Sequence, residues 1–255
     1  MSAMSVLWVL AVVGQTDAAD DSLRILRDRA RETRLSFVGS SAEPQFEAAP
    51  VFRYSDQLRH IRDAGIWIWT QGGRPVAALK VEHYEPGVHP RPWLYCFASL
   101  STELAVAEWT TAATFRAREP GVSWQSLGDK PANSRAARLL QMREIARRFS
   151  AELVRRTDVE ERTQMRLLPR PLFRYAESAE SAVDGAVFGF TGTGTNPDLL
   201  LLLDLTVDEG WRFGFAGMTA EGLVVQLGDK TVWEFPHTAG KGHVFDTWTY
   251  FCPND

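Results

Sequence analysis

The sequence predicts an α+β protein built from two tandem repeats, each with one helix followed by an antiparallel β-meander. Apolar residues recur first at helical spacing and then at alternate positions, and this happens twice along the chain. Short segments containing Gly or Asp separate the later apolar runs, which favours hairpins over helical crossovers. Long stretches of the two halves also match each other. The alternative is a mainly β sandwich or barrel with two covering helices.

One helix is predicted at the start of each repeat. Residues 139–149 place apolar side chains at spacings of three and four, and Asn133 or Ser134 is a suitable N-cap. Residues 23–31 (LRILRDRAR) resemble residues 139–147 (LLQMREIAR), so we expect a similar helix there. The second helix carries five arginines, Arg135, Arg138, Arg143, Arg147 and Arg148. We interpret them as a solvated face rather than a polyanion-binding face.

Seven strands are predicted after the second helix, at residues 149–155, 163–175, 186–191, 199–207, 211–218, 222–227 and 231–235. The run LLLLLD from Leu199 does not alternate, which is typical of a central strand buried on both faces. GTGTNP, at residues 192–197, lies between two of these strands. It lacks the spacing and the lysine of a Walker phosphate-binding loop, so we predict a hairpin turn.

The internal match is the most informative feature of the sequence. PVFRY at residues 50–54 recurs as PLFRY at residues 171–175, and an Asp follows ten residues after each Arg. Alternating aromatic runs come next, IWIWT in the first half and VFGFT in the second. WLYCFASLSTE from Trp93 then matches WRFGFAGMTAE from Trp211. Because the matches keep the same order, we infer an internal repeat.

The chain is expected to contain five segments. These are a signal peptide at residues 1–18, a first repeat at 19–116, a linker at 117–133, a second repeat at 134–236 and a C-terminal tail at 237–255. The linker is assigned from its Pro and Gly residues, which interrupt both helical and strand periodicity.

The first residues predict export. An apolar run at residues 6–13 precedes Thr16 and Ala18, which have the spacing of a signal-peptidase site. A membrane-spanning helix would need about 20 apolar residues, so we expect no transmembrane segment. The alternative is a buried N-terminal helix. On the export interpretation the mature protein is periplasmic or extracellular.

Composition limits the classes of function. The chain has 255 residues, of which 45% are hydrophobic and 24% charged, so it can bury a sizeable core and is not disordered. Its formal net charge of -4 argues against nucleic-acid binding, because surfaces that neutralise phosphates are normally strongly basic. The expected partner is instead an unknown small molecule, a glycan or an envelope protein.

Each repeat carries an Arg and an Asp at the same spacing. Arg53 precedes Asp63 by ten residues, and Arg174 precedes Asp184 by ten. Such a pair can form an anion site or an acid/base pair. We favour a structural ion pair, because two otherwise diverged halves retain it, but keep Arg53 and Arg174 as candidate ligand contacts.

Aromatic residues suggest a binding groove. The chain contains nine tryptophans, and several lie in strands where aromatics recur at alternate positions. The candidate ligand-binding residues are Trp67, Trp69, Trp93 and Trp211. Core packing is the simpler interpretation, but two facing sheets could also form an aromatic groove for carbohydrate or a hydrophobic ligand.

The histidines form two clusters that could each supply part of a metal site. His83 and His89 lie near Glu82 and Glu85, and the other candidate ligands are His237 and His243. Neither spacing matches an HExxH motif or a zinc finger. We treat the second cluster as more consistent with an exposed tail.

Cys96 and Cys252 are the two cysteines. They suit one long-range disulfide in an oxidising compartment, and the alternative is two unpaired thiols. Their spacing excludes a CxxC redox motif. No GxSxG elbow occurs, so nucleophilic hydrolysis has no positive support and we expect neither catalytic residues nor a cofactor.

Several motifs carry a family resemblance. PVFRY, PLFRY, the segment LQMR at residues 140–143 and the pattern MRLLPRPLFRY at residues 165–175 resemble an uncharacterised family of exported bacterial proteins. The resemblance covers most of the mature chain and implies export. That family has no assigned activity, so the resemblance implies no functional residue.

The function expected from the sequence is a non-catalytic binding or envelope-associated module with an aromatic-lined groove between two repeats. One alternative is a periplasmic metal-dependent hydrolase that uses loop histidines. The other is a structural partner protein that associates through a sheet edge.

Overall fold

The computed structural model describes residues 20–110, 114–156, 159–176, 182–237 and 247–253. The fold is mostly β, with 51% strand and 13% helix. The predicted α+β class, one helix followed by one meander per repeat, is therefore wrong. The helical segments among the described residues are short: a helix over residues 20–31, α2 (Arg135–Ala146) and the 3-10 turn η1 (Gln57–Arg59).

Strand pairing explains why the meander prediction is wrong. In a meander each strand pairs with the next strand along the chain. Here β1 (Arg34–Phe37), directly after the first helix, pairs with β7 (Ala105–Glu108), and β10 (Phe149–Arg156) pairs with β17 (Gly222–Leu227). The intervening strands form separate sheets, so each half of the chain is divided between a large sheet and a small one.

Two large sheets form the centre of the molecule, and all strand pairs among the described residues are antiparallel. The first large sheet has the order β19-β6-β5-β4-β2, with β3 also on β4, and the second has the order β12-β14-β15-β16-β9, with β13 also on β14. The first comprises β2 (Gln45–Phe46), β3 (Phe52–Asp56), β4 (Ile61–Gln71), β5 (Arg74–Tyr84), β6 (Trp93–Ser99) and β19 (Trp248–Phe251). The second comprises β9 (Gln125–Ser126), β12 (Arg166–Leu167), β13 (Phe173–Ala176), β14 (Ala182–Thr191), β15 (Pro197–Thr206) and β16 (Gly210–Gly217).

Two smaller sheets complete the described fold. A three-stranded sheet has the order β1-β7-β8, where β8 is Phe115–Arg116. A four-stranded sheet has the order β11-β10-β17-β18, where β11 is Glu160–Gln164 and β18 is Lys230–Phe235.

Local sequence signals agree with these elements. Every residue of β15 is buried, as the non-alternating leucine run predicts, and the glycine-rich turn joins β14 to β15. Ser134 is the N-cap of α2, and its hydroxyl accepts a hydrogen bond of 3.2 Å from the backbone N–H of Ala137.

The two large sheets share the same register across four strands. In the first sheet, one row of paired residues is Tyr54, Ala64, Glu82 and Leu94, and the matching row of the second is Tyr175, Gly185, Asp204 and Arg212. The next row on the same face of the first sheet is Phe52, Ile66, Lys80 and Cys96. The matching row of the second sheet is Phe173, Val187, Leu202 and Gly214. Positions in the two sheets can therefore be compared residue by residue.

The outer strand next to β6 and the one next to β16 come from distant parts of the chain. β9 follows the strands of the first large sheet in sequence but pairs with β16 of the second. β19 follows the strands of the second large sheet but pairs with β6 of the first. Each large sheet thus receives a strand from outside its own half.

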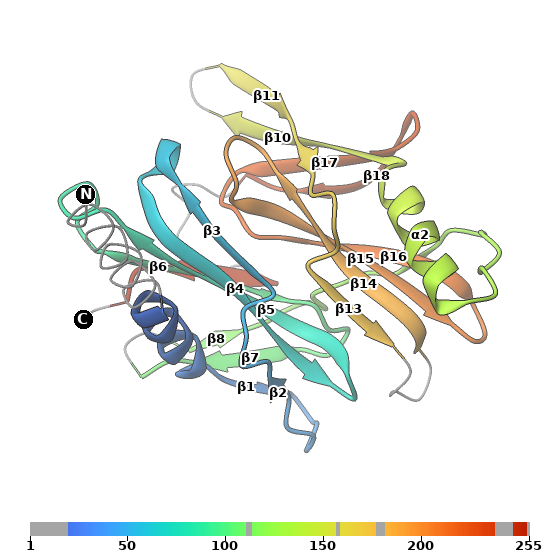
Figure 1. Cartoon of the computed structure of the whole chain (residues 1–255), viewed down its shortest axis with the longest axis horizontal. Coiled ribbons are helices and arrows are strands. Elements are labelled where there is room, and N and C mark those ends of the chain that lie inside the picture. Colours follow the sequence, from blue (N-terminus) through green and yellow to red (C-terminus); the bar gives the residue numbers. More distant parts are fainter. Residues whose placement is uncertain (1–19, 111–113, 157–158, 177–181, 238–246, 254–255) are drawn as a thin grey trace, which may run out of the picture.

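One face of the first large sheet packs against the second large sheet, and its other face packs against the helix of residues 20–31 and the three-stranded sheet. Figure 1 shows the first half on the left, in blue to green, and the orange strands of the second large sheet to the right, with α2 beyond them. Among the described residues no helix is long and apolar enough to span a membrane.

Candidate functional site

Two oppositely charged side chains lie on the face of β5 that packs against the second large sheet. Lys80 and Glu82 are two positions apart on the strand, so their side chains point to the same face. Each is only 2% exposed. The Lys80 ammonium donates a 2.9 Å hydrogen bond to the carbonyl oxygen of Met218. The Glu82 carboxylate accepts hydrogen bonds from the hydroxyls of Tyr54, at 2.7 Å, and Tyr84, at 3.1 Å.

These two charges face a cavity of about 170 Å³, the junction cavity, which lies between the two large sheets. Its walls come from three parts of the chain. The first half contributes Arg59, Lys80, Glu82, Tyr84, Leu94 and Cys96; the second half contributes Asn196, Asp198, Met218, Thr219 and Ala220; β19 contributes Trp248 and Tyr250. Neither half alone forms the cavity.

The turn between β14 and β15 fixes one end of the junction cavity. The Thr195 hydroxyl donates to the carbonyl oxygen of Ser55 at 2.5 Å, and the Thr195 N–H donates to Asp56 at 3.3 Å. Arg59 of η1 donates two hydrogen bonds of 3.1 Å to the carboxylate of Asp198, which is 1% exposed. Such a bidentate pair has little rotational freedom, so it holds the two sheets in register at this end.

Lys80 and Glu82 differ from the Arg59–Asp198 pair because neither takes part in a salt bridge within the described residues. Burial of a charge without an opposite charge is costly. Burial, reinforced by Glu82, raises the pKa of Tyr54 and of Tyr84 well above the ordinary tyrosine value, so both hydroxyls remain protonated donors. Burial also raises the pKa of the Cys96 thiol to about 12, which keeps it neutral.

The matching rows of the second large sheet have a different chemistry. Asp204 stands where the first sheet has Glu82, and it accepts hydrogen bonds from Arg74, at 2.6 Å, and from Arg212, at 2.8 Å. Both guanidinium groups lie over the ring of Trp124, at 4.9 and 4.6 Å from its centroid. Leu202 stands where the first sheet has Lys80. The acid of the second sheet is therefore neutralised by one arginine of its own sheet, Arg212 of β16, and one of the first sheet, Arg74 of β5.

The four candidate tryptophans do not line a groove. Trp67 and Trp211 are fully buried, and Trp69 and Trp93 are 3% and 7% exposed. The first helix and the three-stranded sheet cover the face of the first large sheet that carries Trp67, Trp69 and Trp93. The predicted aromatic groove is thus incorrect for these residues, because alternation indicates a strand but not which of its faces is covered.

The duplicated Arg and Asp residues form ion pairs outside the cavity. Arg53 donates to Asp63 at 3.0 and 2.7 Å, and Arg174 donates to Asp184 at 3.1 and 2.7 Å. Each Asp also binds the helix that precedes its sheet, through Ser22 at 2.5 Å and Arg138 at 2.9 Å. Burial opposes ionisation, but these hydrogen bonds outweigh it and lower the pKa of both carboxyl groups.

The structure does not assemble the predicted metal site. His83 stacks on Trp93, with ring centroids 4.1 Å apart, and Nδ1 of His89 lies 2.7 Å from the carbonyl oxygen of Arg91. Nδ1 of His237 lies 3.1 Å from a carboxylate oxygen of Glu221. His243 lies outside the described residues. In the described part of the chain no group of three or more His, Cys, Asp or Glu residues could hold a metal ion.

Cys96 and Cys252 are free thiols in this structure, so the predicted disulfide is not formed. Cys96 is buried on β6, opposite Tyr250 of β19, and Cys252 follows β19 directly. The C-terminal segment contacts the first half through the pairing of β19 with β6.

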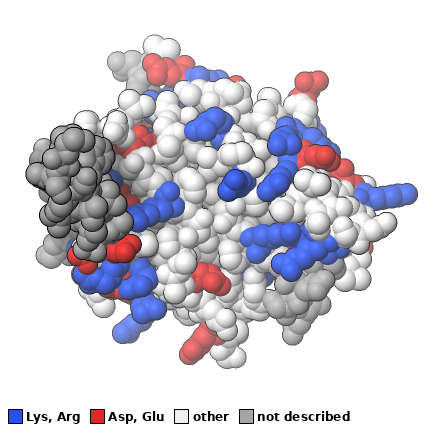
Figure 2. Space-filling model, viewed as in Figure 1, with Lys and Arg blue, Asp and Glu red and all other residues white. Residues whose placement is uncertain are grey.

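The arginines of α2 do not form a single basic face. Arg138 binds Asp184, and Arg148 binds Asp129 at 2.8 Å. On the face shown in Figure 2, Lys and Arg lie in separate groups with acidic residues near several of them. Arg138, at 13% exposure, thus belongs to a buried ion pair, and the solvated-face interpretation does not hold for it.

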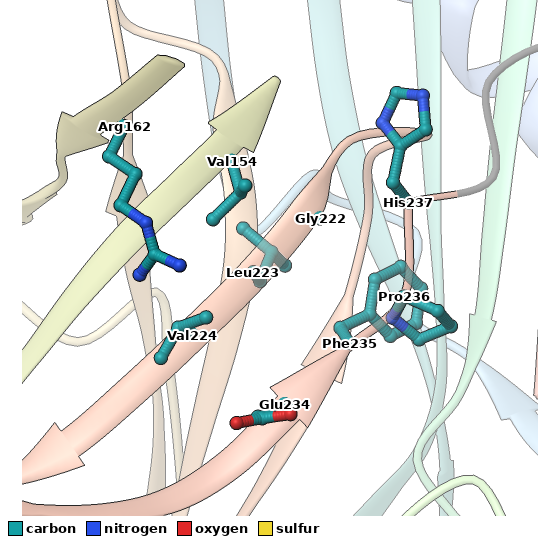
Figure 3. A pocket seen from close by; sticks show the side chains of 9 residues that line it. All are labelled: Val154, Arg162, Gly222, Leu223, Val224, Glu234, Phe235, Pro236 and His237. Carbon is teal, nitrogen blue, oxygen red and sulfur yellow. The ribbon is translucent and has the colours of Figure 1, made fainter. Parts of the chain in front are cut away.

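A second hollow, of about 460 Å³, lies on the four-stranded sheet. Figure 3 shows Arg162 and Glu234 at two sides of it, with Val154, Leu223 and Val224 between them. Arg162 is exposed and already binds Glu152 and Glu160, at 3.1 and 2.9 Å. Its charge is therefore satisfied by neighbours, and the junction cavity is the better candidate site.

Comparisons with protein-family models, curated proteins and solved structures found no match for this chain. Function is therefore inferred from the site alone. The sequence analysis named Glu82 only as a neighbour of His83 and did not identify Lys80. A usable signal was present, since residues 75–84 (PVAALKVEHY) place two charges on one face of an otherwise apolar strand.

Proposed function

We propose that the protein is a non-catalytic binding module that holds a small polar molecule in the junction cavity. One observation carries the proposal: the cavity contains two buried, opposite charges that no salt bridge neutralises within the described residues. A fold gains nothing from such charges, since apolar residues of similar size are usually as stable or more stable. The corresponding Leu202 and the paired Asp204 illustrate the more stable arrangement.

The dimensions of the cavity limit the ligand. A cavity of about 150 Å³ is large enough for benzene, and the junction cavity has about 170 Å³. The ligand should therefore have about six to ten non-hydrogen atoms. A single small sugar fragment fits this volume, and a larger glycan would extend out of the cavity.

Neither alternative function gains support from the described residues. A metal-dependent hydrolase would need ligands that converge, and His83, His89 and His237 each have other neighbours. Association through a sheet edge is disfavoured at β11, because this strand reads EERTQ and charged residues at an edge oppose pairing.

Calorimetric titration of the full chain against a library of small polar molecules tests the proposal. Leu94→Arg should place a guanidinium group beside Glu82, as Arg212 lies beside Asp204, and fill the cavity. We expect one ligand per chain for the natural protein and at least about a hundredfold weaker binding for Leu94→Arg. The control is Leu140→Arg, at an exposed position of α2. Equal affinity in Leu94→Arg and the natural protein, with both folded by near-UV circular dichroism, would refute the proposal.

We also infer that the two halves are repeats of one ancestral unit that exchange an outer strand. The shared register of the large sheets, the two Arg–Asp pairs and the reciprocal placement of β9 and β19 support this inference. Co-expression of residues 19–133 with residues 134–255 tests it. The two fragments should form a one-to-one complex, and their failure to associate would count against strand exchange.

Export and membership of the exported bacterial family remain part of the proposal. They are supported by the apolar run at residues 6–13, by Thr16 and Ala18, and by the motifs PVFRY and PLFRY. The proposed signal peptide at residues 1–18 lies outside the described residues. Mass spectrometry of protein recovered outside the cytoplasm should give a mature chain beginning at Ala19, and an intact N-terminus there would contradict the cleavage.

A further inference from the structure

We propose that the ligand of the junction cavity is a zwitterion of amino-acid size, whose carboxylate binds Lys80 and whose ammonium group binds Glu82. This inference rests on the proposed function and names the class of ligand. It follows from the placement of the two charges. Their Cα atoms lie two positions apart on β5, about 6.6 Å in a strand, so one small molecule can reach both.

Lys80 has the donors that a ligand carboxylate needs. An ammonium group has three N–H donors. One of them donates to the carbonyl oxygen of Met218, and the described residues supply no acceptor for the other two. The bond to Met218 fixes the direction of the side chain, and the two remaining donors are available to a carboxylate in the cavity.

Glu82 has the acceptors that a ligand ammonium group needs. A carboxylate has about four lone-pair sites, and the structure gives Glu82 two donors, the hydroxyls of Tyr54 and Tyr84. These hydroxyls hold the carboxylate in place but carry no positive charge. Arg59 is near enough for Glu82 to contribute to the raised pKa of its guanidinium group, but its hydrogen bonds go to Asp198. A ligand ammonium group would supply a positive charge in direct contact with Glu82.

The matching row of the second sheet shows what an acid at this position binds when it is neutralised. Asp204 has two cationic partners, Arg74 and Arg212. Two positions around Glu82 correspond to these arginines. Asn196 ends the turn from β14 to β15, as Arg74 follows the turn from β4 to β5, and Leu94 pairs with Glu82 as Arg212 pairs with Asp204. Neither side chain is charged, so among the described residues neither position supplies a cation to Glu82, and the proposed ligand would supply it.

Among the described residues, the rest of the wall adds no net charge. Arg59 and Asp198 neutralise each other through their bidentate contact. Leu94, Met218 and Ala220 are apolar, and Trp248 and Tyr250 supply aromatic surface. The unmet requirement of the site is thus one positive and one negative charge. A simple anion would satisfy Lys80 but face Glu82, and a simple cation would satisfy Glu82 but face Lys80.

Calorimetric titrations of the full chain with matched probes test this inference. The zwitterionic probes are L-valine, β-alanine and γ-aminobutyrate, and the singly charged probes are isovalerate and isobutylamine, which are valine without its ammonium group and without its carboxylate. We expect at least one zwitterion to bind, and the matching singly charged probe to bind at least about tenfold more weakly, a difference of 1.4 kcal/mol.

Two variants test which charged group of the ligand binds Lys80 and which binds Glu82. Lys80→Met should remove the preference for a zwitterion over the corresponding amine, because the carboxylate loses its partner. Glu82→Gln keeps one acceptor oxygen for the two tyrosine hydroxyls and places an NH2 group, from which the other hydroxyl oxygen can accept a hydrogen bond, at the second position. This variant should remove the preference over the corresponding carboxylate, because the negative charge is lost. These are differences between ligands on one folded protein, so a general loss of stability would not reproduce them.

The possible failures are distinguishable. Singly charged probes that bind as tightly as the zwitterions would overturn the ligand class. The ligand class is also overturned if none of these probes binds but another small molecule binds the natural protein and does not bind Leu94→Arg. In that case the proposed function still stands. If no ligand of any class is sensitive to Leu94→Arg, the proposed function itself fails, and this inference fails with it.

Discussion

Replacing Asp184 with Asn should destabilise the fold strongly at neutral pH. The Asp184 carboxylate is fully buried and accepts hydrogen bonds from Arg174, at 3.1 and 2.7 Å, and from Arg138, at 2.9 Å. It therefore joins β13, β14 and α2. The variant keeps the size of the side chain but leaves two arginines facing a neutral amide.

The size of the effect follows from burial. Removal of one partner from a buried ion pair costs about 3–5 kcal/mol. The Arg138 and Arg174 side chains are 13% and 19% exposed and can regain some hydration, so we expect the lower end of this range. For a chain of this size 1 kcal/mol corresponds to about 2–4 °C. Asp184→Asn should thus lower the melting temperature by about 6–12 °C.

The dependence on pH gives a second, independent signature. Burial tends to raise the pKa of Asp184, but the hydrogen bonds and charges of Arg174 and Arg138 outweigh it and lower the pKa below the ordinary value. A lowered folded-state pKa gives stability that is fully present above the unfolded-state pKa, about 3.9, and is lost as the pH falls through the folded-state pKa. The difference between the natural protein and Asp184→Asn should therefore be largest near neutral pH and decrease below about pH 4.

Urea unfolding of both proteins at neutral and acidic pH measures this difference. Asp129→Asn is the matched control, because Asp129 binds Arg148 at 2.8 Å with both side chains partly exposed. Such a pair contributes about 0–1 kcal/mol. An equal loss of stability for the two variants, or a loss in Asp184→Asn that does not change with pH, would refute the reasoning.

Three further predictions concern the core and the cavity. Lys80→Leu combined with Glu82→Gln should leave the free energy of unfolding unchanged or raise it by about 1–4 kcal/mol, because buried charges are removed, and urea unfolding would show a decrease if this is wrong. Burial raises the pKa of Cys96 to about 12, so Cys96 should react with a thiol reagent only after unfolding, whereas the partly exposed Cys252 should react in the folded protein. Mass spectrometry of the labelled protein measures the order, and labelling of Cys96 before Cys252 would contradict the prediction. Gly185→Ala should lower the free energy of unfolding by about 1–3 kcal/mol, because the new Cβ would lie 2.3 Å from the ring of Tyr175. An unchanged melting temperature would contradict this.

Elements whose signals are local could be predicted from the sequence. The buried strand from Leu199, the turn at residues 192–196 and the Ser134 cap each depend on residues close together in the chain. The choice between the α+β class and the mainly β alternative could not be made from the sequence, because the pairings of β1 with β7 and of β10 with β17 join distant segments. The residue pattern within β1 or β10 does not indicate whether the strand pairs with the next strand along the chain or with a distant one.

The candidate site divides in the same way. Alternation along β5 places Lys80 and Glu82 on one face, and this was visible in the sequence. The opposite wall was not, because Asp198 lies 139 residues from its partner Arg59. The tryptophans show the converse: the strands that carry them were predicted, but the layer that covers Trp67 and Trp93 comes from the first helix and the three-stranded sheet.

The proposed exchange of outer strands would link ligand binding to the stability of the whole molecule. The junction cavity takes Lys80 and Glu82 from the first half, Asp198 from the second, and Trp248 and Tyr250 from β19. Separation of these parts would therefore destroy the proposed site, and the proposed ligand would bind only the assembled fold. By mass action, a ligand at a hundredfold excess over its dissociation constant then adds about 2.7 kcal/mol to the free energy of unfolding. Each half lacks part of the cavity, so the same ligand should also stabilise the complex of the two halves. Their association constant should increase by about a hundredfold under these conditions.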